Sequence, residues 1–245
     1  MHPVLFTLGP LRVYSYGLMV ALGIITAVFL IQRRAAAWGL PAETIVVMIF
    51  RVIFCGLIGG RLFYVFLNKD FYFNAPLEVF KLYKGGLVFH GSFFLGLLCA
   101  VFFIKKHRLP FLKTMDVLAL FLPLAHAFGR MGCFLNGCCY GRVTDLPWGV
   151  VFPGAVFPVH PVQLYAVFFL ISIFSVLVLI GKRKQFDGQI ISVYLILYGV
   201  VRFGLEFFRG DNPKLMFGLS LFQYISVIIF LSGVFLYRHA MSRKP

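Results

Sequence analysis

The sequence predicts an all-α integral membrane protein with about seven transmembrane helices. Mean hydropathy is +0.93, and only 13% of the 245 residues are charged. Apolar stretches long enough to cross a bilayer, about 20 residues each, recur along the whole chain and leave almost nothing for a soluble domain. Because backbone in lipid must satisfy its own hydrogen bonds, we expect these stretches to be helices of a single polytopic domain over residues 1–245.

Seven spans follow one another at short intervals. We expect them at residues 13–32, 45–67, 86–104, 115–132, 162–181, 189–208 and 217–237. The first has only Arg12 near its start, lacks a small-residue cleavage site and is long enough to span, so we interpret it as a transmembrane helix and not as a cleaved signal peptide. Short outer loops are expected near residues 68–85, 133–160 and 209–216.

The net charge of +15 does not indicate nucleic-acid binding, because 12 of the 23 basic residues cluster in alternate loops. They are Arg33, Arg34, Lys105, Lys106, Arg108, Lys113, Lys182, Arg183, Lys184, Arg238, Arg243 and Lys244. Alternate loops lie on one side of the membrane, and the positive-inside rule makes that side cytoplasmic. The N-terminus is therefore predicted outside and the C-terminus in the cytoplasm, with the basic clusters touching anionic membrane lipids.

Polar residues inside the predicted spans need an explanation, since an arginine at mid-bilayer costs about 2.5–3.5 kcal/mol. They are Tyr16, Arg61, His90, Arg130, Arg202 and Glu206, and with the predicted topology all six fall in the outer half of the membrane. Arginines opposed by few carboxylates favour an anion, and the phosphates at that depth belong to lipid head groups.

The sixth span carries the most regular polar pattern. Tyr198, Arg202, Glu206 and Arg209 are spaced by four, four and three residues, which places them on one helix face. The stripe indicates the lining of a polar cavity. The alternative is an internal Arg202–Glu206 ion pair that merely tolerates burial.

Glycines surround His90 at positions 85, 86, 91 and 96, which is typical of close helix packing. His90 could act as a general base, or it could be a hydrogen-bonded packing residue. His126 has fewer polar neighbours in the sequence, and we interpret it as structural. Pro161 suits the start of the fifth span.

These segments resemble, in order, the motifs of the bacterial prolipoprotein diacylglyceryl transferases. They are YSYGLM around Tyr16, GGRLFYV around Arg61, GGLVFHGSFFLG around His90, HPVQLY from His160 and YGVVRFGLEFFR from Tyr198. Residues 129–142, GRMGCFLNGCCYGR, resemble the family signature, which begins Gly-Arg and continues through Asn-Gly to Tyr-Gly-Arg.

The resemblance implies transfer of the diacylglyceryl group of phosphatidylglycerol to the lipobox cysteine thiol of preprolipoproteins. Glycerol phosphate would be released at the outer face of the bacterial cytoplasmic membrane. Arg130 and Arg202 match residues that would hold the phosphate, and His90 matches the proposed base. The residues expected to bind the substrates are Tyr16, Arg61, Asn136, Gly141, Tyr198, Glu206 and Arg209. No metal or organic cofactor is expected. The alternatives are a phospholipid transporter or scramblase, or a paralogue with a different acceptor.

Cysteines interrupt the signature. Cys133 stands where the family has asparagine, and Cys138 where it has glutamate. We favour a variant of the family that still modifies lipoproteins, because all the arginines expected from the family motifs are present. The three cysteines Cys133, Cys138 and Cys139 lack C-x-x-C spacing and have no neighbouring histidine, which disfavours a zinc site. A Cys133–Cys138 disulfide would leave the third thiol free. None is expected to be the nucleophile, since the acceptor thiol belongs to the substrate. Cys55 and Cys99 are expected to pack within spans.

Overall fold

The computed structural model of the chain describes residues 1–8, 11–81 and 85–243. Seven of the helices within these ranges are long and apolar enough to cross a membrane, which confirms the predicted all-α membrane fold. They are α1 (Ser15–Ala37), α2 (Ala42–Leu67), α4 (Phe89–Lys106), α5 (Phe111–Asn136), α6 (Val162–Lys182), α7 (Gln189–Leu205) and α8 (Leu221–Ser242). The chain divides into two compact units, a larger one of Met1–Ile31 with Met115–Pro245 and a smaller one of Gln32–Thr114.

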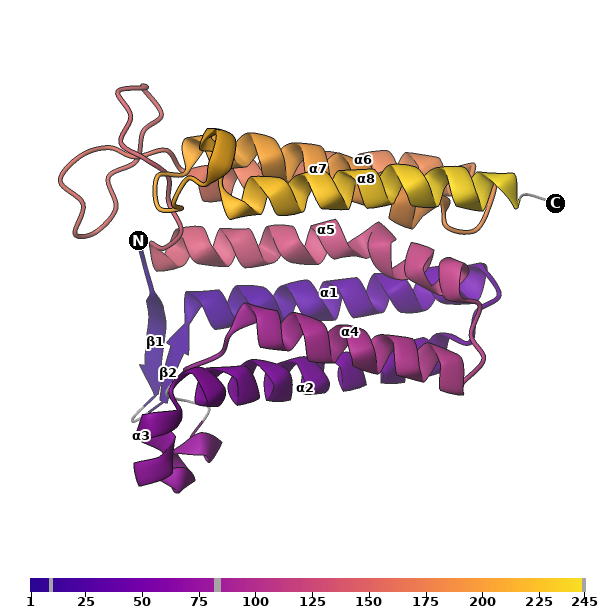
Figure 1. Cartoon of the computed structure of the whole chain (residues 1–245), viewed down its shortest axis with the longest axis horizontal. Coiled ribbons are helices and arrows are strands. Elements are labelled where there is room, and N and C mark those ends of the chain that lie inside the picture. The colour runs from indigo at the N-terminus through magenta and orange to yellow at the C-terminus, as the bar shows by residue number, and fades with distance from the viewer. Residues whose placement is uncertain (9–10, 82–84, 244–245) are drawn as a thin grey trace. The chain divides into compact units, whose positions relative to one another are not determined.

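In the larger unit, α7 packs against both α6 and α8 (Figure 1). Glycines bring α7 and α8 close together. A Cβ on Gly199 would lie 2.9 Å from the carbonyl oxygen of Ser226, and one on Gly233 would lie 2.9 Å from the backbone nitrogen of Ile196. Small residues at such contacts let helix backbones approach within the range where dispersion contacts are strongest.

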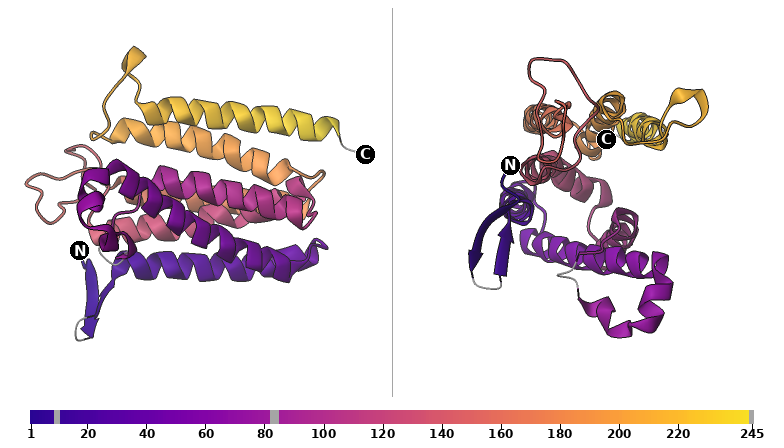
Figure 2. Two further views of the ribbon diagram at one scale, coloured as in Figure 1. Left: turned by 60° about the horizontal axis from the view of Figure 1, so that its bottom comes forward. Right: turned by 90° about the vertical axis from the view of Figure 1, so that its left-hand side faces the viewer.

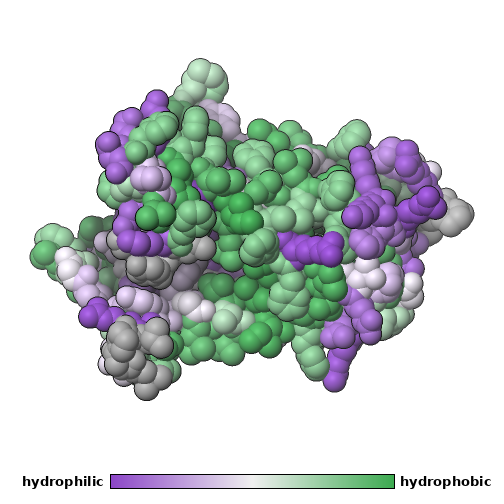
Figure 3. Space-filling model, turned by 90° about the horizontal axis from the view of Figure 1, so that it is seen from below, coloured by the Kyte–Doolittle hydropathy of each residue, from purple (hydrophilic) through white to green (hydrophobic). Residues whose placement is uncertain are grey.

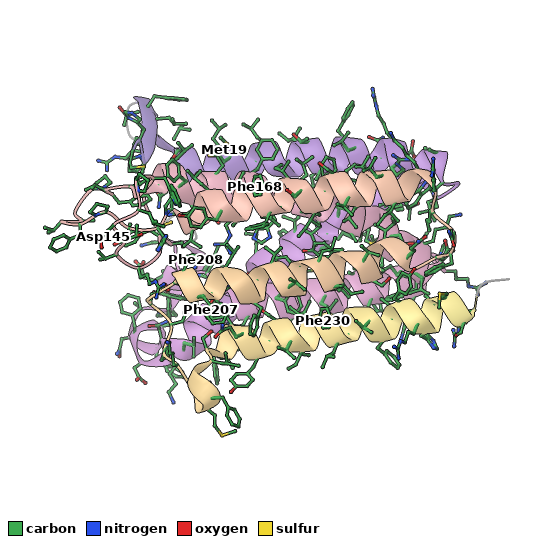
Figure 4. The ribbon with its side chains drawn as sticks, turned by 90° about the horizontal axis from the view of Figure 1, so that it is seen from above. Met19, Asp145, Phe168, Phe207, Phe208 and Phe230 are labelled. Carbon is green, nitrogen blue, oxygen red and sulfur yellow. The ribbon has the colours of Figure 1, made fainter. Side chains whose placement is uncertain are left out.

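The helices α1 and α5 of the same unit run antiparallel, with the start of α1 beside the end of α5. A Cβ on Gly132 would lie 3.2 Å from the Cα of Tyr16 and from the Cβ of Met19, which is labelled in Figure 4. Further along, a Cβ on Gly23 would lie 2.9 Å from the Cβ of Phe128.

A hairpin that the sequence analysis did not predict precedes α1 (Figure 2). The strands β1 (Val4–Leu8) and β2 (Leu11–Tyr14) pair antiparallel, and the chain continues directly into α1. The backbone amide of Ser15 donates to the carbonyl oxygen of Pro3 at 3.0 Å. The first helix therefore starts at residue 15 and not at 13, because residues 13 and 14 complete the strand pairing.

The last helix also starts later than predicted, at Leu221 instead of residue 217. Residues before it form a short 3₁₀ turn, η4 (Met216–Gly218), and Ser220 caps α8. The Ser220 side chain accepts from the amide of Gln223, whose side chain accepts from the amide of Ser220. This reciprocal capping satisfies helix-end amides that otherwise have no partner.

The smaller unit is built on α2 and α4, which pack closely against each other. A Cβ on Gly59 would lie 2.6 Å from the Cβ of Leu95, and one on Gly91 would lie 2.5 Å from the Cβ of Phe63. Gly91 thus serves close packing, as predicted, whereas Gly85 has φ +80° and a Cβ there would meet no atom within 4 Å. After α2 come two short helices, α3 (Lys69–Asn74) and η1 (Pro76–Phe80), where the sequence predicted only a loop.

The surface of the spans is strongly apolar. Only 17–39% of each span is buried, and large side chains on α2 and α4 such as Phe54, Phe66 and Phe102 are more than 60% exposed. On the face seen in Figure 3, hydrophobic residues cover the middle and hydrophilic residues gather toward the two ends. This distribution is that of helices surrounded by lipid.

Candidate active site

Polar side chains of the larger unit line a small cavity at one end of α5 and α7. They are His126, Arg130, Tyr198, Arg202 and Arg209. The apolar side of the cavity comes from Val162, Ala166 and Leu170 of α6, with Val201 and Leu205 of α7. Its volume of about 20 Å³ gives room for roughly one water molecule. Four of the predicted site residues therefore meet in one place.

Arg130 is held by a residue one helical turn earlier. Its Nε donates to Nε2 of His126 at 3.3 Å. A ring nitrogen that accepts belongs to a neutral imidazole with its proton on Nδ1. The ring of His126 in turn lies 5.8 Å from that of Tyr198. His126 was expected to be structural, although its four-residue spacing from Arg130 was a signal for this contact.

Arg202 forms the internal ion pair that was considered as the alternative. Its Nη1 lies 2.6 Å from Oε2 of Glu206, and its guanidinium lies 5.1 Å from the ring centre of Phe222. The other carboxylate oxygen of Glu206 accepts from Ser220 Oγ at 2.8 Å and from Asn212 Nδ2 at 2.5 Å. Glu206 is 5% exposed and does not line the cavity. Its buried charge is balanced by the hydrogen bonds from Arg202, Asn212 and Ser220.

Arg209 is also paired. Its Nε and Nη2 bind the two carboxylate oxygens of Asp211 at 2.9 and 2.5 Å. These hydrogen bonds raise the pKa of Arg209 and lower that of Asp211. The predicted stripe on the sixth span is thus divided, because Tyr198, Arg202 and Arg209 face the cavity while Glu206 faces the start of α8.

The charges of the pocket do not balance. Arg202 and Arg209 each have a carboxylate partner, whereas Arg130 has none within ion-pair distance among the described residues. One guanidinium is therefore oriented without being neutralised. Guanidinium groups bind phosphate and carboxylate through paired hydrogen bonds, so the pocket is suited to an anion.

The signature segment joins the ends of three helices. Asn136 is the last residue of α5, and no hydrogen bond of its side chain is present among the described residues. The amide of Gly141 donates to the carbonyl oxygen of His160 at 2.8 Å, and that of Arg142 to the carbonyl oxygen of Phe208 at 2.9 Å. Figure 4 shows Phe208 at the end of α7 nearest this segment.

Gly141 is explained by packing. A Cβ there would lie 2.6 Å from Cγ2 of Val162 and 2.8 Å from the Cβ of His160. The Cβ would lie closer still to the carbonyl oxygen of Phe208, so any side chain here would push the signature segment away from Phe208 and from the start of α6. Substrate binding by Asn136 and Gly141 stays a prediction.

Gln163 was not singled out from the sequence, yet it is almost fully buried beside the signature segment. Its Nε2 donates to the carbonyl oxygen of Cys138 at 2.6 Å. Its Oε1 is buried and has no hydrogen-bond partner in the described part of the chain. A buried polar atom without a partner costs about 1–3 kcal/mol, which marks this amide as a group available to a ligand or water.

Tyr16 lies at the start of α1, where it contacts Gly132 near the end of α5. Its side chain is 45% exposed and does not line the cavity. The structure therefore brings Tyr16 to the same end of the larger unit as Arg130 without direct contact to the pocket. Its role in binding substrate is untested.

Arg61 of the smaller unit is occupied by backbone carbonyls. Its guanidinium donates to Glu78 at 2.6 Å and to Val79 and Gly85 at 2.8 Å, with longer contacts to Lys81 and Gly86. The residue is 6% exposed and fastens the segment after α2 over the end of that helix. This geometry gives Arg61 a structural function, and substrate binding by it stays a prediction.

His90 is the second residue of α4 and is exposed. Its ring lies 6.0 Å from that of Phe89, and no hydrogen bond to its ring is present in the described ranges. Among the described residues, His90 thus has no partner for the hydrogen-bonded packing role that was considered as the alternative. The role of a base stays a prediction.

Seven apolar spans and a buried pocket with three arginines define a polytopic membrane protein equipped to hold an anionic group. Residues 3–239 match the family described as Prolipoprotein diacylglyceryl transferase. A relative from Clostridium tetani is 36% identical over 249 residues, covering 100% of both chains. One from Geobacter sulfurreducens is 38% identical over 242 residues, covering 95% of this chain and 92% of its own. Both are named phosphatidylglycerol–prolipoprotein diacylglyceryl transferase. The chain belongs to the prolipoprotein diacylglyceryl transferase family, as its motifs predicted.

Proposed function

We propose that the protein transfers the diacylglyceryl group of phosphatidylglycerol to the lipobox cysteine thiol of preprolipoproteins and releases glycerol phosphate. Family membership supports the reaction and both substrate classes. The structural observation that carries the proposal is Arg130, a guanidinium oriented by a neutral histidine and left without a carboxylate among the described residues. The group that completes its charge balance would be the lipid phosphate.

The chemistry makes that phosphate a leaving group. The substrate thiolate attacks the glyceryl carbon that carries the phosphate, a C–S bond forms, and the C–O bond breaks with its electrons going to the phosphate oxygen. Negative charge on that oxygen increases toward the transition state. Arginines directed at it stabilise the transition state more than the bound lipid, which is what accelerates a reaction. We assign this role to Arg130 and Arg202.

The thiol proton must go to a base before or during attack. His90 is our proposal, because it is exposed and histidine is the side chain that most often serves as a general base. Tyr16, Arg61, Asn136, Gly141, Tyr198, Glu206 and Arg209 remain the proposed substrate-binding residues, with Arg61 and Glu206 acting through the segments that they hold in place.

Substrate binding requires the pocket to widen. A cavity of about 20 Å³ holds a water molecule and not a glycerol phosphate head group. The structure thus corresponds to a closed pocket. The Arg209–Asp211 pair lies outside the spans, with Asp211 about half exposed, so we propose that the pocket opens on that side.

We place the protein in the bacterial cytoplasmic membrane with the pocket toward the outer leaflet. The N-terminus would then be outside and the C-terminus cytoplasmic, as the basic loops predict. The segments after α2, α5 and α7 would face outward, where both lipid head groups and exported preprolipoproteins are accessible.

Purified protein in liposomes tests the proposal. Phosphatidylglycerol with a labelled head group and a lipobox peptide should yield labelled glycerol phosphate together with a peptide heavier by the diacylglyceryl group. Neither product should form with a peptide whose cysteine is replaced by serine. Arg130→Ala should strongly reduce the formation of both products. Arg183→Ala should not, because Arg183 is an exposed basic residue at the end of α6.

Two outcomes would contradict the proposal. Lipid that crosses the bilayer without being cleaved would indicate a transporter or scramblase. Head-group release without modification of any lipobox peptide would indicate a family member with a different acceptor.

A further inference from the structure

Three cysteine thiols converge just beyond the pocket. Cys133 lies in the last turns of α5, and Cys138 and Cys139 follow the helix. Their sulfur atoms all lie within 4.8 Å of one another, and none forms a disulfide. Their spacing lacks C-x-x-C pairs, which by itself disfavours zinc. The folded chain supplies the proximity that the spacing did not predict.

The backbone creates this convergence. Gly137 has φ +74°, which ends α5 and reverses the chain, and the amide of Cys138 donates to the carbonyl oxygen of Cys133 at 3.1 Å. Cys139 itself has φ +65°, a conformation that costs a non-glycine residue about 1–3 kcal/mol. Gln163 holds the turn from α6 through the Cys138 carbonyl. The thiols are therefore held together by the packed end of the helix and not by chance side-chain rotamers.

We propose that Cys133, Cys138 and Cys139 form a three-thiolate site for a thiophilic metal ion of the zinc class. Thiolates are soft ligands that prefer such ions. A tetrahedral ion with Zn–S bonds of about 2.3 Å keeps its sulfur atoms about 3.8 Å apart. Since the present separations are within 4.8 Å, each pair needs to approach by at most about 1 Å.

The surroundings suit the charge of such a site. A divalent ion with three thiolates carries one negative charge, and the cationic side chains of Arg130 and Arg209 act on the cluster. The three thiols would release their protons as the ion binds, and the guanidinium charges nearby favour that release.

The site has an entry path and an open position. Cys139 is exposed while the other two thiols are half-buried, so an ion can enter from the side of Cys139. Three protein ligands leave the fourth tetrahedral position for water or another small ligand. The bound ion would cross-link the end of α5 to the segment after it, and so would fix the backbone that begins three residues after Arg130.

Metal content of the purified full-length protein tests this proposal. After incubation with Zn²⁺ and removal of free metal, we expect about one ion per chain, and Co²⁺ in its place should give the intense visible absorption of a tetrahedral thiolate complex. Cys139→Ser and the triple serine variant should lose both signals. The matched control is Cys55→Ser with Cys99→Ser, which removes two thiols of the smaller unit and should retain them.

The wild-type measurement alone can overturn the proposal, even if a serine variant fails to fold. Wild-type protein that retains no Zn²⁺ and gives no cobalt thiolate spectrum contradicts it, as does full metal retention by the triple variant. An intact mass lower by two hydrogens, restored by a reductant without any metal uptake, would assign the cluster to a disulfide. These readouts do not depend on transferase activity, so they stand or fall separately from the proposed function.

Discussion

The Nε of Arg130 donates a hydrogen bond to Nε2 of His126, one turn earlier on α5, at 3.3 Å. A carboxylate at position 126 would orient the guanidinium and also neutralise it. The neutral imidazole orients the guanidinium and leaves its charge in place. The other two arginines of the pocket are paired with Glu206 and Asp211. Arg130 is therefore the pocket arginine whose charge no carboxylate balances among the described residues.

Replacing Arg130 or Arg202 with alanine should lower the rate of glycerol phosphate release about 10²–10³-fold, the usual cost of removing one group that stabilises transition-state charge. Lysine should rescue either position poorly, because a point charge cannot reproduce the planar fork. Membrane insertion should be unchanged. Wild-type turnover by both lysine variants would exclude the phosphate-holding role.

Glu206→Ala should destabilise the protein strongly. It leaves Arg202 without its partner in a largely buried position and removes the acceptor for Ser220 and Asn212. Breaking a buried ion pair costs about 3–5 kcal/mol, so the thermal unfolding midpoint in detergent should fall markedly.

Ser220→Ala provides the comparison for Glu206. It removes one donor to the carboxylate and the cap of α8, which costs about 1 kcal/mol. Equal midpoints for the two variants would show that the ion pair contributes little.

Gly59→Ala should weaken the packing of α2 on α4. The added methyl group would lie 2.6 Å from the Cβ of Leu95 and closer still to the backbone of Gly91, so the helices must separate. Overpacking of this kind costs about 1–3 kcal/mol, measurable as a lower unfolding midpoint. Gly204→Ala is the matched control, because a Cβ there meets no atom within 4 Å. A stable Gly59→Ala protein would argue against the close contact.

Alkylation of Cys139 in metal-free protein should be nearly independent of pH between about pH 8 and 6, because the reactive species is the thiolate. Its pKa is lowered to about 5, first by the hydrogen bond from Cys133. The thiolate is present above that value and is lost as pH falls through it. An ordinary thiol, with a pKa of about 8.5, would slow about tenfold per pH unit over the same range.

Peptide mapping after brief iodoacetamide treatment measures that rate. Cys133→Ala removes the hydrogen bond and should move the profile to higher pH. A tenfold decline per unit below pH 8 in the wild type would show that Cys139 is an ordinary thiol.

The orientation of the protein can be tested with single cysteines in a background that lacks the native ones. We expect an impermeant reagent added outside to label Asn212→Cys and Asp145→Cys, and not Lys106→Cys or Arg183→Cys. Figure 4 labels Asp145 in the long segment between α5 and α6. The opposite pattern would place the pocket at the inner leaflet and would contradict the proposed localisation.

The spans were predictable because hydropathy is a local property. The fifth span was expected at residues 162–181 and α6 is Val162–Lys182, since Pro161 marks its start and basic residues mark its end. Residues 115–132 were expected for the fourth, whereas α5 is Phe111–Asn136. Helical hydrogen bonding continues past the apolar stretch into the residues that flank it. Hydropathy alone therefore underestimates the length of such a helix.

The pocket was predictable in part. Four-residue spacing placed Tyr198 and Arg202 on one face, and both line the cavity with Arg130. The same periodicity suggested that Glu206 would also face it, which was wrong, because the 3₁₀ turn η3 (Glu206–Phe208) ends the helix and directs this carboxylate to Ser220. Helical spacing holds only as long as the helix does.

The sequence by itself determined the seven spans, the positions of the arginines along them and the family to which the chain belongs. These follow from hydrophobicity, helical period and the order of motifs, all of which are carried by neighbouring residues. Only the tertiary structure decided that Arg61 binds loop carbonyls, that His126 orients Arg130 and that three thiols meet after α5. The carbonyl contacts of Arg61 join residues distant in the chain, and the meeting of the thiols depends on backbone turns at positive φ. The contact of His126 with Arg130 depends on side-chain rotamers. The local sequence pattern therefore specifies neither the Arg61 contacts, nor the His126–Arg130 contact, nor the meeting of the thiols.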